Sequence, residues 1–371
     1  MQFNVLTKTH THIVYDNEEH KFTVSGAPVT FIDLKSTPKH RVRIVLGHDC
    51  NQECLFCSNK AYTVRAIDNN TLFDIIDKKI HGEVSSFEFW GGEPLLYWDK
   101  IKELVPLIKR RYNPDFFYLS TNGVLLTEDK VKYCIANKIS ISVSYDGEGQ
   151  FLRGVNPFYI ADFRQAIKLF CERDIKNVCF TPVMSKYNWS FKEYRDNIKK
   201  YFNTPFRIGT PAMLKAYGEN TVKYGITDFT LFLQQNYEDL ITGKVPEMTN
   251  TFNNKIVEIL KGLNYKSKYA CMIESPYYTA IQVDGKFLKC HNFDLEENDK
   301  KLHVLFKSYY DTHCKNCLLK QLCKGGCPFT LSENRKVNEY NCKANFAWYS
   351  LQFSIFCGYL ISGPVVEVSP V

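Results

Sequence analysis

Hydrophobic and polar positions follow two different periods that alternate along most of this chain. Short apolar runs, typical of strands buried in a parallel sheet, are separated by longer segments in which apolar residues recur at helical spacing. The predicted strands are residues 42–46, 86–90, 116–120, 139–144, 177–182 and 206–209. The predicted helices between them are residues 72–80, 99–112, 127–137, 157–173 and 188–201.

This order predicts strand–helix units that place parallel strands inside and helices outside. We therefore expect an α/β fold, a partial (β/α)6 barrel that is TIM-like but has fewer than the eight units of a closed barrel. It should span residues 40–215. In such sheets ligands bind at the carboxyl ends of the strands, which directs attention to the segments that follow each strand.

Three further regions flank this core. Residues 1–39 are predicted to form an N-terminal extension in which residues 12–24 alternate around a polar turn, as in a β-hairpin. Residues 216–265 read as a helical connection, with helices near 228–240 and 251–263. Residues 266–371 form a small region rich in cysteine and loops.

Composition narrows the class of protein. The chain has 371 residues, 44% of them hydrophobic, with 27 Phe and 23 Tyr, which suffices for a full core. Fourteen Cys would suggest disulfides in a secreted protein, but the first residues carry no signal-peptide pattern and no run is apolar enough for a membrane helix. We therefore expect a cytoplasmic protein whose thiols bind metal. The net charge of +7 is spread along the chain, which favours solvated helix faces over nucleic-acid binding.

The first candidate site begins where the first predicted strand ends. Cys50, Cys54 and Cys57 have the spacing CxxxCxxC. Three thiolates on so short a loop can hold three irons of a [4Fe-4S] cube and leave the fourth iron open. A zinc knuckle normally has a fourth Cys or His at similar spacing, and a redox dithiol has a single CxxC, so neither alternative fits this loop well.

Motifs after the next three strands extend this pattern. Gly91-Gly92-Glu93-Pro94 follows the second strand, Ser120-Thr121-Asn122-Gly123 the third and Ser144-Tyr145-Asp146-Gly147 the fourth. Together with the cysteine loop and its Phe56, they resemble the radical S-adenosylmethionine (radical SAM) superfamily. The resemblance implies a [4Fe-4S] cluster on the three cysteines and a SAM molecule on its open iron. It implies SAM contacts from Phe56, Gly91, Gly92, Glu93, Pro94, Ser120, Asn122, Ser144 and Arg153, the last in a segment shorter than the family usually has.

Cysteine density rises again beyond Tyr269. The seven cysteines there are Cys271, Cys290, Cys314, Cys317, Cys323, Cys327 and Cys342. A zinc ribbon on the middle four would leave three unexplained. The spacing Gx4C, CX2CX5CX3C, C resembles the SPASM extension of radical SAM enzymes. This implies that Cys271, Cys290 and Cys327 hold one auxiliary [4Fe-4S] cluster, whose fourth iron is either open or bound by a residue other than Cys. A second cluster would be held by Cys314, Cys317, Cys323 and Cys342.

Some conspicuous residues receive no chemical role. Cys134, Cys171, Cys179 and Cys357 stand in apolar settings, where a free Cys is usually a small buried hydrophobe. The aromatic residues near the end of the chain fit a helix packed against the clusters better than a stacking platform; they are Phe346, Trp348, Tyr349, Phe353 and Phe356.

By resemblance, the enzyme is a peptide maturase. The cluster on Cys50, Cys54 and Cys57 reductively cleaves SAM to methionine and a 5′-deoxyadenosyl radical. The radical abstracts a substrate hydrogen, the auxiliary clusters accept the remaining electron, and residues of a ribosomally made peptide are oxidised or crosslinked. Partners would be a peptide or protein substrate and a reductant such as flavodoxin or ferredoxin, with a separate leader-peptide-binding protein left open.

Three alternative functions stay open. One is anaerobic sulfatase maturation, in which Cys or Ser becomes formylglycine. Sulfatase-maturing enzymes have an Asp, the proposed catalytic base, at the position of His291. This difference weakens the alternative but does not exclude it, because His can also take a proton. A second is dehydrogenation of a small molecule. The third, an electron-transfer protein without SAM chemistry, is disfavoured by the Gly91–Pro94 motif.

Overall fold

The computed structural model describes most of the chain. The described residues are 2–6, 11–16, 21–28, 39–57, 64–80, 82–201, 203–215, 219–248, 251, 275–290, 293–294, 309–327, 330–331 and 334–362. Cys271 and His291, and all but the first residue of the predicted helix at 251–263, lie outside them.

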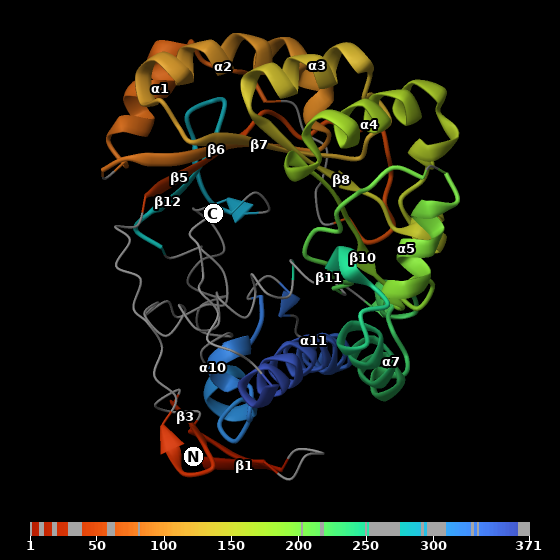
Figure 1. Cartoon of the computed structure of the whole chain (residues 1–371). Coiled ribbons are helices and arrows are strands. Elements are labelled where there is room, and N and C mark those ends of the chain that lie inside the picture. Colours follow the sequence, from red (N-terminus) through yellow and green to blue (C-terminus); the bar gives the residue numbers. More distant parts are fainter. Residues whose placement is uncertain are drawn as a thin grey trace.

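An eight-stranded sheet forms the centre of the described structure, in the order β14-β13-β12-β5-β6-β7-β8-β9. Its strands are β5 (His40–Val45), β6 (Val84–Trp90), β7 (Phe116–Thr121), β8 (Ile139–Ser144), β9 (Val178–Thr181), β12 (Tyr278–Gln282), β13 (Phe287–Cys290) and β14 (Phe293–Asp294). Strands β12 and β5 to β9 are parallel, whereas β13 and β14 add an antiparallel edge. The sheet curves into a partial barrel, so the predicted fold class is confirmed (Figure 1).

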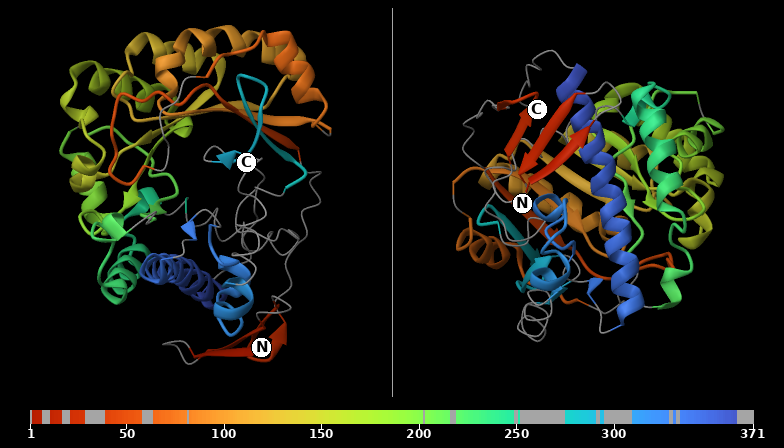
Figure 2. Two further views of the ribbon diagram at one scale, coloured as in Figure 1. Left: turned by 180° about the vertical axis from the view of Figure 1, so that it is seen from behind. Right: turned by 90° about the horizontal axis from the view of Figure 1, so that it is seen from below.

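Helices cover the convex side of this sheet (Figures 1 and 2). They are α1 (Asn69–Asp77), α2 (Trp98–Tyr112), α3 (Glu128–Asn137), α4 (Ala161–Asp174) and, beyond β9, α5 (Phe191–Lys199). In β8, Ile139, Ile141 and Val143 are buried in the hydrophobic core, and the serines that alternate with them point to the opposite face. The concave face of the sheet is therefore partly polar.

The five strand predictions up to residue 182 are confirmed, but the sixth is wrong. Within residues 206–209 only Ile208 forms a single bridge, to Phe180, and the chain then forms β11 (Ala212–Met213), which pairs with β10 (Val183–Met184). Pro205 and Pro211 flank the segment and supply no backbone N–H to a strand ladder. The other side of the sheet is instead extended by β12, which pairs with β5.

A second helical layer lies across the open side of the sheet (Figure 1). It contains α6 (Glu219–Val222), α7 (Phe229–Ile241), α10 (Lys320–Cys323) and the long α11 (Arg335–Ser362). The predicted helix at 228–240 is thus confirmed. Although α11 has 28 residues, no helix in the described part of the chain is apolar enough to cross a membrane.

The N-terminal segment packs against the end of α11. Strands β1 (Gln2–Leu6), β2 (His12–Asp16), β3 (Lys21–Val24) and β4 (Ala27–Pro28) form an antiparallel sheet. The predicted hairpin is β2 and β3; β1 was not predicted. The rings of Tyr15 and Phe353 are 5.2 Å apart and those of Phe22 and Phe356 are 4.9 Å apart. Phe353 and Phe356 of α11 therefore pack against the N-terminal sheet, whereas Phe346 is exposed.

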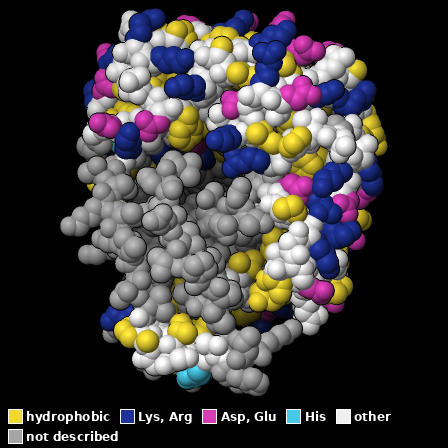
Figure 3. Space-filling view, viewed as in Figure 1, with side chains coloured by type: hydrophobic (Ala, Val, Ile, Leu, Met, Phe, Trp, Pro, Cys, Tyr) yellow, Lys and Arg dark blue, Asp and Glu magenta, His cyan; other side chains and the backbone are white. Residues whose placement is uncertain are grey.

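Lys and Arg side chains are distributed over the helical face seen in Figure 3, with Asp and Glu among them. Many are paired locally, as Arg111 is with Asp74 and Asp77. This face carries no continuous basic stripe, which agrees with the prediction of solvated helix faces.

We predict that Phe22→Ala destabilises the protein by about 3–5 kcal/mol, because it removes a large buried side chain from the contact between the N-terminal sheet and α11. Chemical denaturation measures the change. Leu231→Ala on the exposed face of α7 is the control and should change stability by less than about 0.5 kcal/mol. Equal effects of the two variants would contradict the packing described here.

Candidate functional site

The cysteine loop begins directly after β5. The Cys57 N–H donates to the Cys54 carbonyl at 3.0 Å, which turns the loop back on itself. Burial raises the pKa of Cys54 to about 11; the Arg153 guanidinium opposes this, and the Cys57 and Cys50 thiols add to it. The three thiols are therefore close enough to interact, and bound metal would stabilise their deprotonated forms.

The three thiols are the donor set that a [4Fe-4S] cube takes, with one thiolate on each of three irons. Among the described residues, no group of three His, Cys, Asp or Glu side chains is arranged to hold a single metal ion. The cube on these cysteines stays a prediction.

The Gly91–Pro94 motif lies against the backbone of the cysteine loop. The Gly92 N–H donates to the Gly47 carbonyl at 3.0 Å, and the Glu93 N–H donates to the Asp49 carbonyl at 2.8 Å. A Cβ at Gly92 would stand 2.2 Å from the Asp49 oxygen, closer than any real contact. Only glycine permits this approach, so the motif fixes the start of the cysteine loop.

Glu93 joins the ends of two strands through a buried carboxylate. Its Oε1 accepts hydrogen bonds from Thr121 Oγ1 at 2.6 Å and from the Leu95 N–H at 3.0 Å, and its Oε2 accepts one from the Asn122 N–H at 2.7 Å. Burial raises the pKa of Glu93, and these three donors oppose the rise. Glu93 thus positions the ends of β6 and β7, while Pro94 begins the short 3-10 helix Pro94–Tyr97.

Asn122 extends this connection to the cysteines. Its Nδ2 donates to Asn51 Oδ1 at 2.7 Å and lies 3.9 Å from Cys50 Sγ, while its Oδ1 accepts from the Val124 N–H at 3.0 Å. Burial raises the pKa of Cys50, and the contact with Asn122 lowers it. An amide that donates to this sulfur favours the thiolate form that binds iron.

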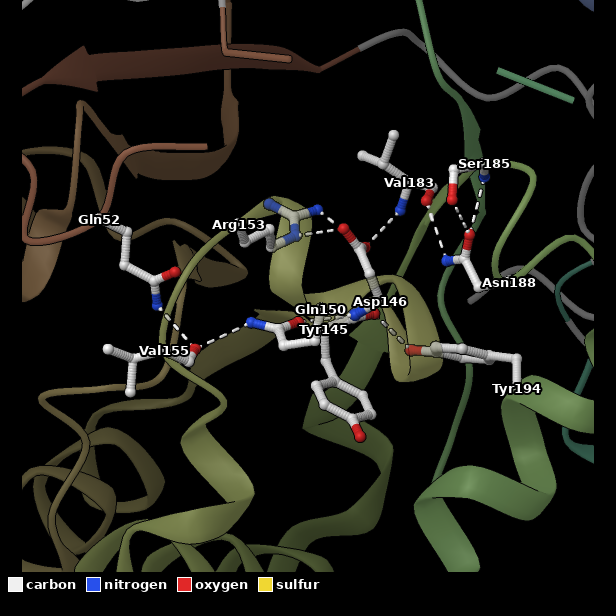
Figure 4. A network of polar contacts seen from close by, with 10 residues as sticks. All are labelled: Gln52, Tyr145, Asp146, Gln150, Arg153, Val155, Val183, Ser185, Asn188 and Tyr194. Atoms are coloured by element: carbon white, nitrogen blue, oxygen red, sulfur yellow. Dashed lines mark hydrogen bonds and ion pairs between the residues drawn. The ribbon is translucent and has the colours of Figure 1, made fainter. Parts of the chain in front are cut away.

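A second polar network lies at the end of β8 (Figure 4). Asp146 accepts two hydrogen bonds from Arg153, at 2.7 and 3.1 Å, and one from the Val183 N–H at 2.7 Å. Burial raises the pKa of Asp146, which the Arg153 guanidinium counteracts. The guanidinium carbon also lies 5.1 Å from the ring centre of Phe56. This network therefore joins the cysteine loop to β8 and β10.

The remaining predicted SAM contacts are near this edge of the sheet. Ser120 and Ser144 are partly exposed, in β7 and β8, and Gly91 follows β6. Their contacts with SAM stay predictions.

One positioning residue has no signal in the sequence. The Tyr97 hydroxyl accepts from the Asp49 N–H at 3.0 Å and donates to Asp49 Oδ2 at 2.9 Å. A single tyrosine after the motif carries no pattern, so its role emerges only from the folded chain.

Four of the downstream cysteines line one cavity of about 50 Å³. They are Cys314, Cys317, Cys323 and Cys342, which are the four assigned to the second auxiliary cluster, and Cys327 is absent from the lining. Burial raises the pKa of Cys323 to about 12, with Lys215 opposing. The donor set fits the predicted cluster. Cys290 is the last residue of β13, and its role as a cluster ligand stays a prediction.

Of the cysteines without a predicted role, three are buried among apolar residues, whereas the Cys179 thiol lies 3.8 Å from the Thr181 hydroxyl. Cys134, Cys171 and Cys357 are buried, and Cys179 is partly buried on the concave face of the sheet. Burial raises the pKa of Cys134 to about 12.

Comparison with known proteins places this site in a family. Residues 44–198 match the Radical SAM superfamily. The chain is similar to a cysteine-type anaerobic sulfatase-maturating enzyme of Clostridium perfringens strain 13, at 23% identity over 323 residues, covering 75% of this chain and 85% of the relative.

Two solved structures show the same fold. The first, native anSMEcpe with bound AdoMet and Cp18Cys peptide, has a TM-score of 0.62 at 20% identity and covers 86% of this chain and 98% of its own. The second, Streptococcus suis SuiB bound to precursor peptide SuiA, has a TM-score of 0.54 at 18% identity and covers 81% of this chain and 74% of its own.

We predict that Arg153→Met lowers the free energy of unfolding by about 3–5 kcal/mol, because it leaves the Asp146 carboxylate buried without its partner. The double variant Asp146→Asn, Arg153→Met should recover much of this loss, since no unpaired charge remains. Urea denaturation measures both. A double variant as unstable as the single one would show that the lost stability does not come from the unpaired Asp146 carboxylate.

Proposed function

We propose that this chain, whose residues 44–198 match the Radical SAM superfamily, oxidatively modifies or crosslinks residues of a ribosomally made peptide, with three [4Fe-4S] clusters and SAM as cofactors. When bound, these cofactors supply a 5′-deoxyadenosyl radical that removes a substrate hydrogen, and sites that accept the electron left behind. The protein binds and orients the reactants.

Cys50, Cys54 and Cys57 would hold the cluster that binds SAM. The backbone at Gly91 and Gly92 approaches this loop closely, so it is the natural cradle for the amino group of SAM. Ser144 would add a hydroxyl from β8. Arg153 is already bound to Asp146, so we assign it to holding Phe56 beside the cofactor rather than to a direct contact.

The auxiliary clusters are assigned to the cysteine-rich region. A single observation carries this part of the proposal: four cysteines that are separated in sequence line the same cavity. They are Cys314, Cys317, Cys323 and Cys342. Cys271, Cys290 and Cys327 are left for the first auxiliary cluster. An enzyme with internal electron acceptors can carry out a net oxidation.

A peptide substrate is supported from two sides. The relatives with the same fold include one bound to a precursor peptide and one bound to the Cp18Cys peptide. The concave face of the sheet, where Ser140 and Ser144 are partly exposed, offers hydroxyl groups to a peptide backbone. Two further partners are expected in a reducing cytoplasm. One is a reductant such as flavodoxin or ferredoxin, and the other, left open above, is a separate protein that binds a leader peptide.

Sulfatase maturation is the second candidate. It is favoured by the similarity to the Clostridium perfringens enzyme over 75% of this chain. We rank it lower because His291 follows Cys290, where sulfatase-maturing enzymes have an Asp. His291 would be the catalytic base in either reaction. A small-molecule dehydrogenase is a third candidate without a specific contact in its favour.

A direct comparison of substrates tests this proposal. The anaerobically reconstituted enzyme is incubated with SAM, dithionite and either a precursor peptide encoded beside its gene or a peptide from a Cys-type sulfatase. Peptide maturation predicts loss of hydrogen with all sulfur retained, read by mass spectrometry. Loss of sulfur from the sulfatase peptide, with an aldehyde in its place, would reverse the ranking.

We predict about twelve irons per chain after anaerobic reconstitution, corresponding to three cubes. Replacement of Cys50, Cys54 and Cys57 by Ala should remove about four, because the auxiliary ligands are untouched. Iron analysis and the visible spectrum measure the change. Loss of all iron in this variant would contradict separate cluster sites.

A further inference from the structure

Lys215 lies where the barrel meets the cysteine-rich region. It follows β11, and the preceding Leu214 is fully buried, with its N–H donating to the Met184 carbonyl at 2.9 Å. The Leu214 carbonyl accepts a hydrogen bond from Tyr340 of α11 at 3.4 Å. These contacts on both sides fix the backbone that carries Lys215 against α11.

The side chain of Lys215 points toward the four-cysteine cavity. Its ammonium donates to the Oδ1 of Asn345, a residue 7% exposed that lines this cavity. Burial lowers the pKa of Lys215 to about 8, and the Cys323, Cys327 and Cys342 thiols oppose this fall. Through Asn345, the partly buried ammonium is thus held beside the cavity that the four cysteines line.

Asn345 is itself held in place by the turn that carries these cysteines. Lys324, Gly325 and Gly326 all have positive φ angles, of 47°, 79° and 80°. A Cβ at Gly326 would stand 2.2 Å from Asn345 Nδ2, so only glycine lets the turn approach the amide. Asn345 also lies one helical turn after Cys342 on α11, so the amide that orients Lys215 is built into the cluster site.

We propose that Lys215 is a positioning residue that raises the reduction potential of the auxiliary cluster held by Cys314, Cys317, Cys323 and Cys342. The proposal rests on the cluster assignment of the proposed function. Reduction of a cluster by one electron adds one negative charge. A cation held nearby, away from water, stabilises that charge strongly because the local dielectric constant is low.

Other basic residues near the cavity are less suited to this role. Lys320 lines the cavity, but its ammonium lies 5.2 Å from the ring centre of Tyr310, whereas that of Lys215 is held by Asn345. Lys343 is next to Cys342 in sequence yet exposed, where water screens its charge. Lys343 therefore provides a matched control, because it carries the same charge next to a predicted ligand but is exposed to water.

The test is a redox titration of the full chain followed by electron paramagnetic resonance. The variants Lys215→Gln, Lys215→Met, Lys215→Arg and Lys343→Met are compared, each carrying Cys50, Cys54 and Cys57 replaced by Ala so that the auxiliary clusters alone contribute. The relevant signal is the one that Cys342→Ala abolishes. In both neutral variants, the ratio of reduced to oxidised cluster at a given potential should be at least tenfold lower than in the parent. This corresponds to a shift of the reduction potential by about 59 mV to more negative values for one electron. Lys215→Arg and Lys343→Met should stay near the parent.

The outcomes separate the inference from the function on which it rests. Full auxiliary iron and an unmoved potential in both neutral variants would overturn the role of Lys215. Loss of auxiliary iron in both neutral variants, with retention in Lys215→Arg, would make Lys215 a requirement for assembly and would equally overturn a tuning role. Absence of auxiliary iron in the parent protein would refute the cluster assignment itself.

Discussion

The buried carboxylate of Glu93 is the contact on which the candidate active site depends. Its oxygens accept from Leu95, Thr121 and Asn122, and its own N–H donates to Asp49, so one residue joins β6, β7 and the cysteine loop. Burial of a carboxylate without such donors would cost several kcal/mol of folding free energy. The folded state therefore keeps each donor in its place. Gly92 allows the close backbone approach that makes this geometry possible.

The same principle recurs at two other places on the rim of the barrel. Asp146 and Arg153 join β8 to the cysteine loop through Phe56, and Lys215 with Asn345 joins the end of β11 to the four-cysteine cavity. Each contact combines a buried charge with a short polar partner. Polar contacts next to the hydrophobic core thus fix the geometry at the cysteine loop and at the four-cysteine cavity.

The features that could be predicted from the sequence are those that depend on local residue patterns. Strands β5 to β9 and helices α1 to α5 follow from periodicity, and the cysteine spacing marked both candidate cluster sites. It did not predict β12 beside β5, because that pairing joins segments far apart in the chain. It overpredicted a strand at 206–209, where Pro205 and Pro211 limit the ladder. The partners of Glu93 and Arg153, and the roles of Tyr97 and Lys215, depend on tertiary contacts of common residue types, which leave no pattern to read.

The central claim, that this chain generates a radical which attacks a peptide, is tested most directly by isotope transfer. A precursor peptide with deuterium at its carbon positions is incubated with the reconstituted enzyme, SAM and dithionite, and the mass of the 5′-deoxyadenosine is measured. The account predicts that 5′-deoxyadenosine gains one deuterium in step with peptide oxidation. Formation of modified peptide alongside unlabelled 5′-deoxyadenosine would contradict it.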